Sequence, residues 1–173
     1  MKVKLLINND MEIEAEITEE EYNKLLNKSK ETGYELKFQS KDNKYYYIDD
    51  SSIGQVETDY DTNRNLDCNR YNNANYYSNK KVAQNNARAD TLMRELRRFA
   101  REHQQNNINW NDVLQNKYQI RYNYSFKEII MPKSNSIRDF GAIYFDSEEI
   151  AQEAINKFRD ELIWYFKTYK DSI

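Results

Sequence analysis

The longest regular pattern in the chain, and the one that most limits its fold, covers residues 79–104. Its apolar residues lie within a band about 120° wide on a helical wheel. They are Val82, Ala89, Leu92, Met93, Leu96, Phe99 and Ala100. A helix of this length with one apolar face must bury that face against other elements. The sequence therefore predicts a long amphipathic helix at the centre of a packed domain.

The N-terminal segment has the pattern of a small ββα module. Residues 2–7 and 11–17 alternate between apolar and polar side chains and predict a β-hairpin. Thr18 follows, with Glu21 three residues later, which is the signature of a capping box at the start of a helix. We expect residues 1–40 to form this module.

The next segment is expected to finish the module and to begin a second hairpin. The first helix should end near Gly33, and residues 34–39 alternate like a returning strand. Residues 45–48 and 55–58 flank a polar turn and predict another hairpin. Residues 61–75 are mostly polar and predict a long loop.

The C-terminal third predicts short strands followed by one long helix. Trp110 and the two residues 113–114 are expected in a short helix or turn, and residues 117–131 in two strands. A short strand is expected at 141–145, and a helix capped by Asp146 or Ser147 should continue to residue 169. Its apolar face would contain Ala151, Ala154, Ile155, Phe158, Leu162, Tyr165, Phe166 and Tyr169.

Together these patterns predict an α+β fold. The ββα module would be followed by a main domain at residues 41–173, in which an antiparallel sheet carries two long amphipathic helices. Residues 76–84 align with 144–152, which suggests a β-β-α pseudo-repeat. The alternative is that any strand followed by a capped helix would align in this way.

Few residues in the chain could support catalysis or hold a metal ion. Glycine occurs only at positions 33, 54 and 141, so the glycine-rich nucleotide-binding and nucleophile motifs are absent. Cys68 and His103 are the only residues of their types, too few for a structural zinc site. A nucleophilic pair of these two residues is the weaker interpretation. We expect a protein without enzymatic activity, cofactor or metal.

Acidic residues cluster near the second hairpin and could act as paired carboxylates or as oxygen ligands for a cation. They are Asp49, Asp50, Glu57, Asp59 and Asp61. The favoured interpretation is a solvated rim of the hairpin.

Charge is unevenly distributed along the chain. Residues 1–61 carry a net charge of −7, whereas residues 80–101 carry +5. The arginines at 94, 97, 98 and 101 point away from the apolar band of the predicted helix. They form either a solvated face neutralised by the acidic N-terminal segment, or a surface for an acidic protein or nucleic acid.

Two further features could belong to a binding surface. Trp164 lies off the apolar face of the last predicted helix, so it must contact another element or remain exposed. The segment 62–81 mixes basic and aromatic residues, as single-stranded nucleic-acid sites do, although the pI of about 5.4 opposes that interpretation. The candidate partner-binding residues are Lys80, Lys81, Arg88, Arg94, Arg97, Arg98, Arg101 and Trp164.

The sequence also gives expectations about location. No stretch reaches 18 consecutive apolar residues, and the start of the chain does not have the pattern of a signal peptide. A single cysteine is typical of a reducing compartment. We expect a cytoplasmic protein of a bacterial host cell that does not contact a membrane.

Four segments resemble small proteins of phages and prophages of low-GC Gram-positive bacteria. They are Tyr45–Asp49, the stretch from Arg70 to Ser78, Glu95–Ala100 and Phe140–Phe145. The resemblance covers residues 44–169. Some small acidic phage proteins of this kind inhibit bacterial defence systems, including the CRISPR nuclease Cas9. The resemblance carries no functional residues over to this chain.

We therefore expect a phage-encoded, anti-CRISPR-like inhibitor that binds a host defence effector which handles nucleic acid. One alternative is a nucleic-acid-binding accessory protein that uses the basic helix at 80–101. A second is an anti-defence protein that binds or hydrolyses a small ligand. The sequence leaves homo-oligomers open.

Overall fold

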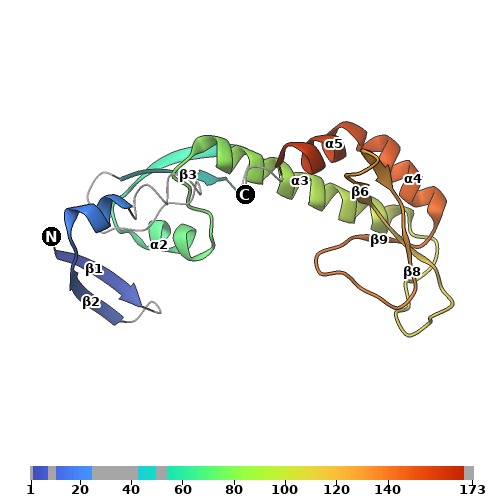
Figure 1. The fold of residues 1–173 in the computed structure, drawn as a ribbon, viewed down its shortest axis with the longest axis horizontal. Helices are drawn as coiled ribbons and strands as arrows, with labels where there is room; N and C mark the ends of the chain where they lie inside the picture. The colour runs from blue at the N-terminus through green and yellow to red at the C-terminus, as the bar shows by residue number, and fades with distance from the viewer. Residues whose placement is uncertain (1, 8–10, 25–42, 50–53, 170–173) are drawn as a thin grey trace. The chain divides into compact units, whose positions relative to one another are not determined.

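The computed structural model describes residues 2–7, 11–24, 43–49 and 54–169 of the chain. Its helices and antiparallel strands confirm the α+β class (Figure 1). The chain divides into two compact units, Met1–Ala87 and Arg88–Ile173. The sequence-based boundary at residue 40 lies in 25–42, outside the described residues, and stays a prediction.

The first unit begins with the predicted hairpin. Strands β1 (Lys2–Ile7) and β2 (Met11–Glu16) pair antiparallel, with Leu5 opposite Ile13. The capping box follows, and the described part of the helix is residues 19–24. The Thr18 hydroxyl oxygen accepts the Glu21 N–H at 3.1 Å, while a Glu21 carboxylate oxygen accepts the Thr18 N–H at 2.8 Å. The helix end at Gly33 and the strand at 34–39 lie outside the described residues.

The second predicted hairpin is also confirmed. Strands β3 (Asn43–Ile48) and β4 (Val56–Asp61) are antiparallel, and Tyr46 forms a further β-bridge with Tyr77. The expected loop at 61–75 is wrong, because helix α2 occupies Asn65–Asn72. This helix has little amphipathic character. It forms because the Asp67 carboxylate accepts the N–H groups of Thr62 and Arg64 at its start.

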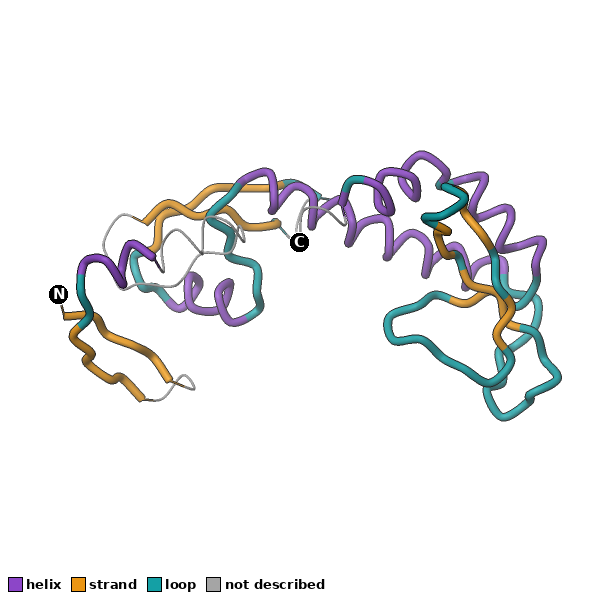
Figure 2. The backbone as a smooth tube through the Cα atoms, viewed as in Figure 1, coloured by secondary structure: helices purple, strands orange, loops and turns teal. Residues whose placement is uncertain are grey.

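The long helix of the sequence analysis is α3, Lys80–His103, shown in purple in Figure 2. The Asn79 side-chain oxygen accepts the Lys81 N–H at 2.8 Å and so caps its first turn. Three apolar side chains of its C-terminal half, those of Leu92, Leu96 and Phe99, are buried, and Met93 and Ala100 are partly buried. This burial explains why the apolar spacing predicted the helix so well.

The second unit contains two small sheets where the sequence predicted two strands. Strand β5 (Lys117–Gln119) lies between β8 (Lys133–Ser134) and β9 (Tyr144–Phe145). Strands β6 (Arg121–Asn123) and β7 (Glu128–Ile130) form a separate hairpin. The expected strand from 117 divides at residue 120 because its two halves pair with different partners. The segment 110–114 forms turns, as one of the two alternatives expected.

The single helix expected at the C-terminal end is two helices, α4 (Glu148–Lys157) and α5 (Arg159–Lys167). The backbone leaves the helical region at Phe158, with φ −107° and ψ 20°, and the Phe158 ring lies edge-on to Phe99 at 5.8 Å. Ser147 rather than Asp146 caps α4, because its hydroxyl accepts the Ile150 N–H.

The core of the second unit combines one face of α3 with α4, α5 and the short sheets. Its buried residues are Leu92, Leu96, Phe99, Tyr118, Phe145, Ile150, Ala151, Ala154, Ile155, Phe158 and Leu162. The aligned segments 76–84 and 144–152 each run from a β-bridge or strand into a capped helix. Their relation as a pseudo-repeat stays a prediction.

Candidate binding site

The exposed basic residues of α3 are the starting point for the site. Lys80 and Lys81 are exposed in its first turn, within the first unit, and the arginines at 94, 97, 98 and 101 are exposed within the second. Only Arg98 of these four has an ion-pair partner among the described residues, Glu102 at 4.0 Å. The described structure therefore leaves most of this predicted arginine surface without a carboxylate partner.

Two of the predicted binding residues are instead engaged with each other inside the second unit. Two Arg88 nitrogens donate to the two carboxylate oxygens of Glu161, at 2.7 and 2.8 Å. The guanidinium carbon lies 4.0 Å from the centre of the Trp164 ring. The hydrogen bond from Arg88 lowers the pKa of Glu161. Arg88 and Trp164 thus join α3 to α5, which gives the off-stripe tryptophan a structural contact.

A polar pocket of about 320 Å³ lies beside the C-terminal half of α3. We call it the arginine pocket, because Arg97 and Arg101 of α3 and Arg138 of the β8–β9 connection all line it. The other lining residues are Ala100, Gln104, Ile108, Trp110, Ala142, Ile143 and Tyr144. Among the described residues, none of the three arginines makes an ion pair.

Hydrogen bonds fix the segment that carries Arg138. The buried Tyr144 hydroxyl oxygen accepts the N–H of Asp139 at 2.7 Å. The Asp139 carboxylate accepts hydrogen bonds from Gln119 and Arg121, and these two bonds lower its pKa. The carboxylate next to Arg138 in the sequence is therefore already used by other residues.

Trp110 and Tyr144 form an aromatic wall of the arginine pocket. The Trp110 ring lies edge-on to Tyr144, with 4.8 Å between ring centres and 83° between planes. The Arg138 guanidinium lies 5.6 Å from the centre of the Trp110 ring. Indole beside guanidinium is a favourable cation–π pair, so this contact helps to orient Arg138 toward the pocket wall.

A buried lysine adds to the positive charge of this region. Lys117 is fully buried, and its ammonium donates to the carbonyl oxygens of Asp112, Gln115 and Asn135 at 2.8, 2.9 and 3.1 Å. These three acceptors satisfy all its donors without neutralising its charge. The ammonium lies 5.3 Å from the centre of the Trp110 ring. Lys117 therefore anchors the turns around Trp110 and contributes a fixed positive charge.

Sequence reasoning found two of the three arginines and missed the rest of the site. Arg138 lies in a polar run that served only to end the preceding strand, and Lys117 has the appearance of an ordinary strand lysine. Trp110 and Tyr144 carry no spacing signal for a site. The hydrogen bond from the Asp139 N–H to the Tyr144 hydroxyl attaches the segment that carries Arg138 to the aromatic wall of the pocket.

Asp59 and Asp61 do not belong to the solvated rim that the sequence suggested, Asp49 is half-buried, and Asp50 lies outside the described residues. Asp61 is buried and accepts the Tyr76 hydroxyl at 2.9 Å, and Asp59 pairs with both Arg64 and Arg70 at 3.0 and 2.9 Å. Glu57 is exposed, as expected. Asp67 also belongs to this cluster, although its role was not predicted from the sequence.

Asp67 and Tyr45 form the centre of this acidic cluster. Both are fully buried, and the Tyr45 hydroxyl donates to Asp67 at 2.8 Å while accepting from Arg70 at 2.6 Å. Burial alone would raise the pKa of Asp67, but hydrogen bonds from Arg64, Tyr45 and the backbone outweigh it and hold the pKa far below its ordinary value. Burial raises the pKa of Tyr45 to about 12. Both Asp67 oxygens accept hydrogen bonds from neighbouring protein groups, which favours a structural role for this network.

The two residues of the weaker nucleophile hypothesis have separate local contacts. The Cys68 thiol donates to the Asn63 side-chain oxygen at 3.7 Å. The His103 ring stacks on Phe99 at 3.9 Å, and its Nδ1 lies 2.9 Å from the Phe99 carbonyl oxygen. Within the described part of the chain, no three His, Cys, Asp or Glu residues are grouped so that they could hold a metal ion.

Comparison with protein-family models, with curated protein sequences and with solved structures finds no match to this chain. None of the described helices combines the length and apolar content needed to cross a lipid bilayer.

Proposed function

We propose that this protein is a non-enzymatic binding protein whose arginine pocket recognises an acidic surface of a protein partner. The observation that carries the proposal is the presence of Arg97, Arg101 and Arg138 in one pocket without an ion pair to a described residue. Guanidinium groups pair with carboxylates in bidentate geometry. A pocket lined by three of them favours a partner that presents several acidic side chains.

Exposed aliphatic side chains favour a protein as the partner. Leu114 is 86% exposed and Ile137 is 69% exposed, and they belong to the segments that carry Trp110 and Arg138. Exposed aliphatic groups contribute to protein interfaces when they become covered. Arginine and tryptophan are also the residues that dominate the binding energy of protein interfaces.

The biological form of this proposal is a phage-encoded inhibitor of a host defence effector. Its support is the resemblance of the four sequence segments given above, together with the pocket. Nuclease centres hold carboxylates that bind metal ions, and these are natural targets for a cationic pocket. The inhibitor would then act by covering an acidic functional surface, without chemistry of its own.

The test compares acidic-ligand binding by the unaltered protein and by a triple variant. The triple variant carries Arg97→Ala, Arg101→Ala and Arg138→Ala. The matched control is Arg159→Ala, which removes an exposed arginine of the same unit that does not line the pocket. Fluorescence anisotropy would measure binding to labelled polyglutamate, and co-purification would measure binding to a panel of defence nucleases. We expect the triple variant to bind at least tenfold more weakly, and the control to bind like the unaltered protein.

The proposal would be overturned if neither polyglutamate at low salt nor any nuclease of the panel binds the unaltered protein. Equal binding by the triple variant and the control would also overturn it, because the pocket would then have no part in recognition.

A second candidate is nucleic-acid binding, favoured by the indole of Trp110 beside the Arg138 guanidinium. Base stacking on an aromatic ring, together with phosphate contacts from arginine, is how many proteins hold single strands. A labelled single-stranded oligonucleotide would then bind with an affinity that falls steeply with salt, and each arginine removed would reduce the salt slope by about 1. The absence of binding to the oligonucleotide at low salt would exclude this candidate.

A further inference from the structure

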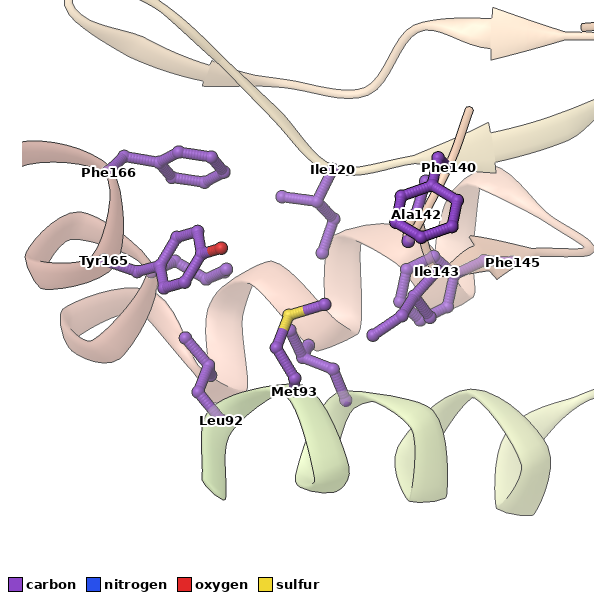
Figure 3. A pocket seen from close by; sticks show the side chains of 12 residues that line it. Leu92, Met93, Ile120, Phe140, Ala142, Ile143, Phe145, Tyr165 and Phe166 are labelled. Atoms are coloured by element: carbon purple, nitrogen blue, oxygen red, sulfur yellow. The ribbon is translucent and has the colours of Figure 1, made fainter. Parts of the chain in front are cut away.

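A second pocket of about 200 Å³ in the same unit has a different chemistry. We call it the apolar pocket. Its lining residues are Leu92, Met93, Leu96, Ile120, Phe140, Gly141, Ala142, Ile143, Phe145, Leu162, Tyr165 and Phe166. Figure 3 shows these side chains converging from α3, from α5 and from the segment before β9. The phenol of Tyr165 is the only side-chain oxygen of the lining residues, and most of the pocket surface is apolar.

The pocket has room for one large apolar side chain. An engineered cavity of about 150 Å³ lined by Leu, Ile and Phe stays dry and binds benzene. At about 200 Å³, the apolar pocket can take a phenyl ring or a leucyl group. A methyl group would leave most of it empty.

One wall of the apolar pocket is a phenylalanine that the chain itself does not cover. Phe140 is fully exposed although it lines the pocket. Gly141 follows with φ +74°, a backbone conformation that side chains disfavour, and no atom lies within 4 Å of where its Cβ would be. Figure 3 shows Phe140 beside Ala142 and Ile143 at the side of the pocket. A ligand in the pocket would cover Phe140 and remove its apolar surface from water.

The apolar pocket and the arginine pocket share two lining residues, Ala142 and Ile143. The segment 140–144 therefore has an apolar site on one side and three arginines without ion pairs on the other. A ligand that fills both sites needs a large apolar group within a few residues of several negative charges. An acidic polypeptide segment meets both requirements.

We propose that the apolar pocket is the anchor site for one phenylalanine or leucine side chain of an acidic segment of the partner, whose neighbouring carboxylates pair with Arg97, Arg101 and Arg138. This inference rests on the proposed function and adds the chemistry of the recognised segment. The anchor provides most of the selectivity among acidic sequences, because the arginine pocket alone accepts any cluster of carboxylates.

The first experiment measures the affinity of the unaltered protein for two labelled peptides. Both carry two aspartates on each side of a central residue, which is phenylalanine in one and alanine in the other. Burial of a phenyl group predicts that the phenylalanine peptide binds about tenfold more tightly or better, as measured by NMR titration or anisotropy. A third peptide, with phenylalanine between lysines, tests whether an apolar group alone is sufficient, and we expect no binding.

The second experiment places the anchor in the apolar pocket. Phe140→Ala removes an exposed wall, and Met93→Trp fills the cavity from α3. Phe126→Ala is the matched control, because Phe126 is also exposed, at 76%, and lies in the turn between β6 and β7 without lining either pocket. Both pocket variants should reduce the preference for the phenylalanine peptide to less than threefold, and the control should keep it. We expect Phe140→Ala to fold normally, because the Phe140 ring is exposed and is not part of the buried core. This variant therefore keeps the test valid if Met93→Trp fails to fold.

The outcomes separate this inference from the proposed function. Equal binding of the phenylalanine and alanine peptides overturns the anchor and leaves the arginine pocket as an acidic-surface site. If neither peptide binds but polyglutamate does, the anchor alone is overturned; if the peptides, polyglutamate and the nuclease panel all fail to bind, both proposals are overturned. Free indole serves as a small apolar probe, and NMR shifts at Met93 and Ile143 would report its binding. If the lysine-flanked peptide or indole binds and the aspartates have no effect on affinity, the pocket is a site for small apolar groups. That result would overturn the acidic segment as the ligand.

Discussion

At the scale of single residues, the buried carboxylate of Asp67 connects several described segments of the first unit. It accepts N–H groups from Thr62 and Arg64 at 3.1 and 3.0 Å and the Tyr45 hydroxyl at 2.8 Å. A buried charge costs free energy unless donors of this kind surround it. Asp67 therefore joins β3, the end of β4 and the start of α2 through one side chain.

Asp67→Ala should lower the free energy of unfolding by about 3–5 kcal/mol, because it leaves Tyr45 and two backbone donors unsatisfied in the interior. Urea denaturation followed by circular dichroism would measure the loss. Glu57→Gln, an exposed change in β4, should shift stability by less than about 0.5 kcal/mol. A loss below about 1 kcal/mol for Asp67→Ala would contradict the central role of this carboxylate.

The same carboxylate predicts how stability depends on pH. Because the folded state lowers the pKa of Asp67, its contribution is complete above the pKa of the unfolded chain, which is about 3.9. The contribution should decrease as the pH falls below that value. Denaturation at pH 6, 4 and 3 should show a decline for the unaltered protein that is reduced in Asp67→Asn. Equal decline in both would contradict this assignment.

Arg88 is the residue where the sequence and the structure differ most about role. Sequence reasoning placed it in a partner-binding surface, but its guanidinium pairs with Glu161 and covers the Trp164 ring. One face of the guanidinium lies on the Trp164 ring and one of its edges pairs with Glu161, so these groups are engaged within the second unit.

A double-mutant cycle of Arg88→Ala and Glu161→Gln should give a coupling of about 0.5–1 kcal/mol, small because both side chains are partly exposed. Arg88→Ala should also change Trp164 emission, since it uncovers the indole ring. Trp164→Phe in the same background is the control that assigns the fluorescence. Binding to acidic peptides should remain as in the unaltered protein, and a large loss would return Arg88 to the binding surface.

At the scale of elements, α2 shows how a helix can form without an apolar stripe. Its start depends on Arg64 and Asp67, and its end on Ala74, whose φ of 55° lies in the left-handed region. The Asn75 N–H donates to the Arg70 carbonyl at 2.8 Å and the Ala74 N–H to the Tyr71 carbonyl at 3.0 Å, as in a Schellman motif. Glycine usually occupies this position, so the alanine gave no stop signal.

Ala74→Gly should raise the free energy of unfolding by about 0.5–1 kcal/mol, because glycine adopts this conformation without a steric penalty. The matched control is Ala100→Gly in the right-handed interior of α3, which should lower stability by about 1 kcal/mol. Urea denaturation of both variants would test the opposite signs. A decrease for Ala74→Gly would show that the left-handed alanine carries no strain.

At the scale of the whole molecule, the chain contains two compact units with different kinds of interior. The unit Met1–Ala87 is organised around tyrosines and buried carboxylates, whereas Arg88–Ile173 has an apolar core of leucine, isoleucine, alanine and phenylalanine. Helix α3 contributes residues to both units. Both pockets of the proposed site lie within the second unit.

Because each unit is compact in itself, a substitution should act mainly on the unit that contains it. Leu162→Ala removes a buried core side chain and should accelerate amide hydrogen exchange in residues 105–167, while 54–79 stay near their original rates. Asp67→Ala should give the reverse pattern. Hydrogen exchange with mass spectrometry would measure both, and equal acceleration in both regions would show a single cooperative structure.

The sequence by itself determined the elements whose signals are local. Alternation placed both hairpins, Thr18 with Glu21 gave the capping box, and the apolar spacing of residues 79–104 placed α3. These predictions succeed because the side-chain periods of strands and helices follow from backbone geometry. The arginines of α3 could be assigned to one exposed face for the same reason.

Only the tertiary structure decided the features that depend on contacts distant in the chain. The Tyr45 hydroxyl donates to Asp67 from 22 residues away, the C-terminal helix divides where Phe158 meets Phe99, and Arg88 of α3 contacts Glu161 and Trp164 of α5. Trp110 and Arg138 reach the arginines of α3 from two different loops, which Lys117 and Tyr144 hold in place. None of these contacts has a period in the sequence, because long-range packing and hydrogen bonding choose them after the local elements have formed.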